Sequence, residues 1–135
     1  MTGENKKVNI RQQIKRAEEF LEAAELLHKN GYNNDAVSRL YYFLFHYIKA
    51  LLFSRDLEPR SHEGALQYFG LHFVKSGEFL PSDSHAFSRL MKYREEGDYN
   101  PSYVFTQADY TQFKGDARQL ADKIRGFLEA RGYGE

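Results

Sequence analysis

Apolar residues recur at every third or fourth position through most of this chain, which is the spacing of one face of an α-helix. The first such face ends near the pair Asn30-Gly31, because glycine accepts the left-handed backbone that closes many helices. A length of 135 residues fits one domain. We expect residues 1–9 to form a flexible tail and residues 10–132 to form a single domain. The members of the first face are Ile10, Ile14, Ala17, Leu21 and Ala24.

Four further stretches show helical spacing, at residues 34–54, 61–74, 82–97 and 106–131. Residues that cap helix N-termini stand at the start of each stretch, and Thr106 forms a capping box with Asp109. No stretch alternates for long enough to predict a strand. Five helices with short connections predict an all-α fold, an up-and-down antiparallel bundle. The predicted caps are Asn33 to Asp35, Ser61, Ser82 to Ser84 and Thr106.

The predicted second helix is apolar around most of its circumference and polar along one narrow stripe. At about 100° per residue, the polar positions fall within a sector of about 100°. A helix so nearly apolar lies at the centre of a bundle or is covered partly by a second subunit. The stripe is a solvated edge, an interface between two copies, or a site that converges on a phosphate. Its members are Asp35, Ser38, Arg39, Tyr42, His46 and Lys49.

The predicted fourth helix has an arginine on its apolar face. Arg94 stands seven positions after Phe87, where the next member of the apolar series belongs. Burying a lone guanidinium is costly, so Arg94 either pairs with a carboxylate or opens onto a cleft. Asp98, four residues on, is the nearest carboxylate that could form such a pair. The pair would lock the helix end, whereas the cleft would make Arg94 an anion-binding or catalytic residue.

The composition limits the functions that this chain can perform. Lysine plus arginine and aspartate plus glutamate both number 19, so no overall field attracts nucleic acid or acidic lipid. A nucleotide or RNA site must therefore be a local patch. Cysteine is absent, which fits a reducing compartment, and no apolar run is long enough to span a bilayer. We expect a cytoplasmic protein with no membrane contact, no metal and no cofactor, since metal-binding histidine spacings and a phosphate-binding glycine loop are missing.

Three groups of these residues together resemble a known family. The stretch SRLYYFLFHYIKALL begins at Ser38, the pair Ser61-His62 follows, and Arg94 precedes Asp98-Tyr99. This pattern is similar to that of the small stand-alone branch of the HEPN family, the "higher eukaryotes and prokaryotes nucleotide-binding" domains. The branch pattern reads S-R-x-Y-Y-x-x-F-H-x-x-K-A-L-L, then Ser-His, then R-x-x-x-D-Y.

The resemblance implies an up-and-down helical bundle that forms a homodimer. It also implies a minimal nucleotidyltransferase as partner, in a toxin and antitoxin pair. Many HEPN proteins are metal-independent ribonucleases with an R-x(4–6)-H motif at a helix end. Here Tyr99, Asn100 and Pro101 stand where that histidine would follow Arg94. Arg39 and His46 match R-x6-H by count, but they lie within the predicted second helix.

We therefore predict a nucleotide-binding or partner-binding module that works with a nucleotidyltransferase. The alternatives are a metal-independent HEPN ribonuclease that acts on RNA, and a dimeric scaffold without catalysis. The candidates for catalysis are Arg94, which would bind the phosphate, and His46, whose imidazole suits proton transfer. The candidates for nucleotide or phosphate binding are Arg39, Tyr42, Lys49, Asp98 and Tyr99.

Overall fold

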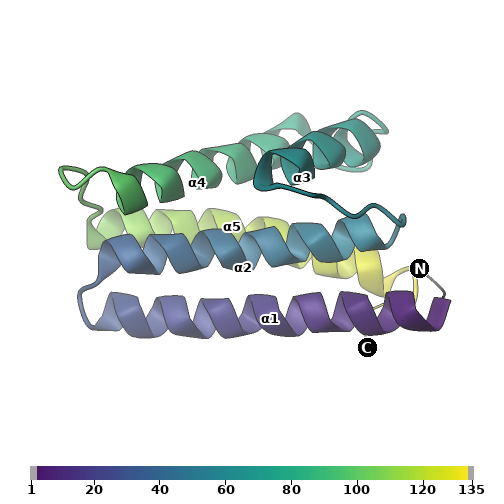
Figure 1. Cartoon of the computed structure of the whole chain (residues 1–135), viewed down its shortest axis with the longest axis horizontal. Coiled ribbons are helices and arrows are strands. Elements are labelled where there is room, and N and C mark those ends of the chain that lie inside the picture. The colour runs from purple at the N-terminus through teal and green to yellow at the C-terminus, as the bar shows by residue number, and fades with distance from the viewer. Residues whose placement is uncertain (1–2, 134–135) are drawn as a thin grey trace.

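A computed structural model describes residues 3–133 of the chain and contains helices but no strand in that range. Four long helices run alternately up and down, and the short α3 packs beside α4 at one end (Figure 1). The predicted all-α antiparallel bundle is therefore confirmed. The elements are α1 (Gly3–Lys29), α2 (Asn33–Phe53), α3 (His62–Phe69), the π-helical turn η1 (Gly70–Val74), α4 (Pro81–Tyr99) and α5 (Gln107–Glu129).

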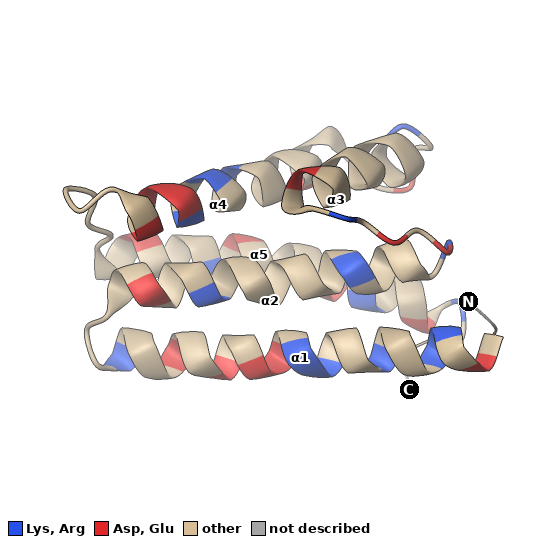
Figure 2. Ribbon diagram, in the orientation of Figure 1, with Lys and Arg blue, Asp and Glu red and all other residues tan. Residues whose placement is uncertain are grey.

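Helix α2 is the central element, because α1, α3, α4 and α5 all pack against it. Leu40, Phe43, Leu44 and Ile48 on this helix are completely buried. The polar stripe between these apolar positions stays half-buried or exposed. Charged positions are also sparse along α2, whereas they occur along the whole of α1 (Figure 2). The prediction of a core helix with one polar edge is confirmed.

Helix α1 begins earlier than the apolar pattern indicates. We predict a tail before Ile10, but residues 3–9 are helical in the structure, and residues 1–2 lie outside the described residues. Lys6 lies within this extension, and its Nζ is 3.1 Å from a carboxylate oxygen of Asp56, in the loop after α2. The apolar pattern could not reveal this extension, since its side chains are polar apart from Val8.

Two of the predicted caps are wrong. Asn34 is inside α2, where its Nδ2 donates to the Tyr103 carbonyl at 2.7 Å and its Oδ1 accepts from the Phe105 amide at 2.9 Å. Helix α4 begins at Pro81, and the Leu80 amide ahead of it donates to the Asp83 carboxylate at 2.8 Å. Proline is favoured at the first helical position because its missing N–H needs no partner there. The caps at Ser61 and Thr106 are confirmed.

The segment after α4 is held against the start of α2 by these Asn34 hydrogen bonds and by one close contact. A Cβ at Gly97 would lie only 2.7 Å from Cε2 of Phe105, whose side chain is 3% exposed. Gly97 is therefore required by the close approach of the Phe105 ring. This contact positions the last turn of α4, which carries Asp98 four residues after Arg94.

Candidate functional site

Arg94 is the one charged residue that the structure buries among residues 3–133, with 9% of its surface exposed. Its Nη1 lies 3.6 Å from Asp98, its Nη2 lies 3.9 Å from Glu95, and its Nε has no hydrogen-bond partner among the described residues. Charge-assisted hydrogen bonds measure about 2.7–2.9 Å, so neither carboxylate is bonded to the guanidinium. Arg94 thus keeps its donors available.

Two tyrosine rings of α2 lie against the Arg94 guanidinium. Its Cζ lies 5.1 Å from the ring centre of Tyr41 and 5.8 Å from that of Tyr42. The electron-rich faces of these rings attract a cation without using its N–H donors. The arrangement holds a guanidinium in place and leaves its hydrogen-bonding capacity for an anion.

His62 also contacts Tyr41. The side chain of Ser61 accepts from the Gly64 amide at 2.8 Å and caps α3, which makes His62 the first residue of that helix. The Nδ1 atom of His62 lies 2.6 Å from the hydroxyl of Tyr41. Burial, and then the positive charge of Arg94, lower the pKa of His62 below its usual value. Burial raises the pKa of Tyr41 above its usual value, so at neutral pH the imidazole is uncharged and the phenol keeps its proton.

His46 belongs to a separate cluster between α1 and α2. Its Nδ1 lies 2.6 Å from Oε1 of Gln13, and its ring stacks on Phe20 at 5.4 Å between centres. Burial, followed by the positive charges of Lys49 and Arg16, lowers the pKa of His46 to about 4. His46 is therefore uncharged near neutral pH and adds no positive charge for a phosphate.

Arg39 lies in the same α1–α2 cluster, at the surface. Its Cζ is 5.7 Å from the ring centre of Phe20, and that of Arg16 is 5.5 Å from the same ring. Both arginines line a hollow of about 370 Å³, together with Glu19, Phe20 and Ala23. Two exposed guanidinium groups beside one ring form a local basic patch on a chain of zero net charge.

Tyr42 stands between the two clusters. Phe20 stacks on the Tyr42 ring at 5.4 Å, and the Arg94 guanidinium contacts the same ring. The structure therefore places Arg94, Tyr42 and Asp98 together with His62. It places Arg39 and His46 in the neighbouring α1–α2 cluster.

The remaining predicted residues lie at the edges of these clusters. Lys49 is half-buried with its Nζ 5.7 Å from the ring centre of Phe45 and 5.8 Å from that of Phe53. Asp98 accepts from the Ser38 hydroxyl at 3.5 Å, on the side of the site that faces solvent. Tyr99 ends α4 and is 79% exposed, so its phenol points away from the protein interior.

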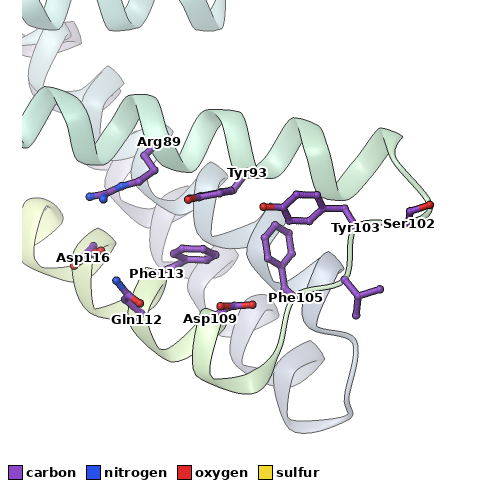
Figure 3. Close-up of a pocket in the computed structure, with 10 residues that line it drawn as sticks. Arg89, Tyr93, Ser102, Tyr103, Phe105, Asp109, Gln112, Phe113 and Asp116 are labelled. Atoms are coloured by element: carbon purple, nitrogen blue, oxygen red, sulfur yellow. The ribbon is translucent and has the colours of Figure 1, made fainter.

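A well-defined hollow of the described residues lies elsewhere. It has a volume of about 440 Å³ and lies between α4, α5 and the segment before α5 (Figure 3). The stacked rings of Tyr93 and Phe113 and the side chains of Arg89 and Gln112 line it. No residue predicted for the site lines this hollow, and we assign the candidate site to the buried Arg94 instead.

Reasoning from the sequence missed His62 and Tyr41 as site residues. The helical wheel placed Tyr41 on the apolar side, and the spacing of His62 matched no metal motif. One signal was present: the pair Ser61-His62 is part of the pattern that carries the family resemblance. No three His, Asp or Glu side chains gather as a metal site requires, among the residues that the structure describes. Within that range no helix is long and apolar enough to cross a membrane.

The fold and the site together define a class: a small helical bundle with a buried arginine beside a histidine and a tyrosine. The model of the HEPN domain matches residues 10–130, and the chain therefore belongs to the HEPN family. A protein of Methanocaldococcus jannaschii named "Putative toxin MJ0605" is 34% identical over 116 residues, which cover 86% of each chain. A second protein of that organism, "Putative toxin MJ0142", is 34% identical over 76% of this chain and 71% of its own length. A Thermotoga maritima "UPF0332 protein" is 33% identical over 85% of this chain and 87% of its own length.

Proposed function

We propose that this chain is a toxin-type HEPN module that binds a phosphate group of a nucleotide or of RNA at Arg94. The observation that carries the proposal is a guanidinium that is almost fully buried and whose Nε has no hydrogen-bond partner among the described residues. Family membership and the names of the two Methanocaldococcus relatives support the toxin-type function.

The surroundings of Arg94 favour a bound phosphate over a permanent ion pair. Arginine presents planar, forked donors that match phosphate oxygens. Asp98 and Glu95 are both exposed, so they stay hydrated and hold the guanidinium only loosely. A phosphate that accepts hydrogen bonds from this buried guanidinium would gain more in the low-dielectric interior than either exposed carboxylate does.

The proposal includes two protein partners. We propose a second copy of the chain and a minimal nucleotidyltransferase, because residues 38–99 resemble those of HEPN proteins that pair in this way. Light scattering measures the mass of the purified chain, and co-expression with a nucleotidyltransferase encoded by an adjacent gene measures the second contact. A strictly monomeric mass would contradict the proposed homodimer. Failure of the two proteins to co-purify would contradict the proposed nucleotidyltransferase partner.

Calorimetric titration with AMP, and then with a short single-stranded RNA, tests the phosphate site. Arg94→Ala should weaken binding about tenfold or more, because hydrogen bonds to charged groups contribute about 1.5–3 kcal/mol each. The matched control is Arg89→Ala, an exposed arginine on the same helix, which should leave the affinity unchanged. Adenosine, which lacks the phosphate, should bind equally to the wild type and to Arg94→Ala. Equal affinity of AMP for the wild type and for Arg94→Ala would contradict the proposal.

A metal-independent ribonuclease is the second candidate. The observation that favours it is that the His62 imidazole and Arg94 both contact Tyr41, although the family motif histidine is absent from α4. Incubation of labelled RNA with the protein in EDTA, followed by electrophoresis, tests it. Cleavage that is lost in Arg94→Ala and kept in Arg89→Ala would favour the enzyme over the binding module. Intact RNA in all samples would exclude the ribonuclease.

A further inference from the structure

We infer that His62 is a second ligand of the phosphate bound by Arg94, and that Tyr41 makes its Nε2 the atom that donates. This inference rests on the proposed phosphate site and names a further part of it. Arg94 comes from α4 and His62 from α3, so the site would join two helices through a tyrosine of α2.

The first step is proximity. Arg94 and His62 both contact the ring of Tyr41, with Arg94 Cζ 5.1 Å and the imidazole centre 5.5 Å from the ring centre. Both also lie near Tyr42, at 5.8 Å and 6.0 Å from that ring centre. Two groups that contact the same two rings lie in the same part of the bundle, and the inference places one phosphate between them. The electrostatic effect of Arg94 on His62 is consistent with this proximity.

The second step is the direction of the hydrogen bond between Tyr41 and His62. The phenol has one proton, and the Nδ1 atom of His62 is the acceptor that the structure places within reach of it among the described residues. A buried hydroxyl whose proton finds no acceptor is costly, so the phenol donates to Nδ1. Nδ1 then accepts, and the proton of the neutral imidazole is on Nε2.

The third step is the consequence for an anion. An imidazole with its proton on Nε2 presents a donor on the side of the ring opposite Tyr41. The Phe45 ring, 4.4 Å from the imidazole between centres, helps to hold that ring in place. His62 and Arg94 would then supply a neutral and a charged donor to the same phosphate. Tyr41 acts here as a positioning residue, since it touches the imidazole and not the ligand.

Nitrogen NMR of the histidine rings at pH 7.5 tests the orientation without any ligand. The wild-type protein should show His62 with its proton on Nε2, and Tyr41→Phe should reduce the population of that tautomer. A proton on Nδ1 in the wild-type protein would overturn the inference. This measurement uses the native chain, so it remains decisive even if a variant does not fold.

Calorimetric titration with AMP tests the contact itself. His62→Gln keeps an amide donor near the position of Nε2 and should retain affinity within about threefold, whereas His62→Asn cannot reach that position and should lose about tenfold. His85→Asn, an exposed histidine on α4, is the control and should bind like the wild type. Wild-type affinity in His62→Asn, or equal losses in both His62 variants, would overturn the inference. If Arg94→Ala still loses affinity in that case, the proposed function stands; if AMP does not bind the wild type, the proposed function itself fails.

Discussion

Each of the two polar clusters of this bundle contains a histidine and an arginine, but the two clusters differ in the partner of the histidine and in the burial of the arginine. In the α2–α3–α4 cluster, Nδ1 of His62 lies 2.6 Å from the Tyr41 hydroxyl, and the inferred donation from that phenol puts the imidazole proton on Nε2. In the α1–α2 cluster, His46 meets the amide oxygen of Gln13, which can only accept, so Nδ1 carries the proton. The arginines differ too: Arg94 is almost fully buried, and Arg39 is exposed.

Residue type alone therefore does not determine the chemistry of a cluster in this fold. With the inferred tautomer, the first cluster presents a charged donor and a neutral donor, which suits an anion. The second has a neutral histidine whose free nitrogen accepts, beside an open basic surface. Helix α2 contributes to both clusters, and only the elements that pack against each side differ.

The largest expected effect concerns the stability of the fold. Arg94→Met should raise the free energy of unfolding by about 1–3 kcal/mol, because an apolar side chain of similar length replaces a buried charge whose carboxylate partners lie 3.6 Å and 3.9 Å away, too far for strong hydrogen bonds. The same change at exposed Arg39 should alter stability by about 0.5 kcal/mol or less. Urea denaturation measures both variants. A large loss of stability in Arg94→Met would mean that the Asp98 pair stabilises the fold.

The next largest effect on stability is expected from a substitution near the end of α4. Gly97→Ala places a methyl group against the Phe105 ring, and we expect it to lower the free energy of unfolding by about 1–2 kcal/mol. Gly115→Ala is the matched control, because its Cβ would meet open space within α5, and it should stabilise the protein by about 0.5–1 kcal/mol. If Gly97→Ala is as stable as the wild type, the contact with Phe105 does not constrain the helix end.

In the α1–α2 cluster, His46 should make the free energy of unfolding depend on pH. The folded-state pKa of His46 is lowered to about 4, so the unfolded chain binds a proton more readily than the native one. Stability should therefore fall as the pH drops from about 6.5 to about 4. His46→Asn keeps a donor for Gln13 and does not titrate, so its loss over this range should be smaller. Urea denaturation at pH 7 and at pH 4.5 measures the difference, and identical losses would contradict the assignment.

Much of the fold follows from apolar spacing that the sequence displays directly. Helix α2 combines nearly continuous apolar positions with one polar stripe, and this pattern predicts both its central place and its exposed edge. The capping box of Thr106 and Asp109 is local, so it could be found from neighbouring residues alone. The role of Asn34 could not be found from neighbouring residues, because its hydrogen bonds go to residues of a distant loop.

The candidate site also combines features that the sequence predicts with contacts that depend on the packing of the helices. Helical periodicity alone predicts that Arg94 stands on an apolar helical face and that Arg39 and His46 share a stripe, because it places residues of one helix. The packing of the helices was needed to show that His62 and Arg94 both contact Tyr41 and that His46 contacts Gln13 and Phe20. Those contacts link different helices, and they depend on how the helices pack rather than on any spacing within one of them.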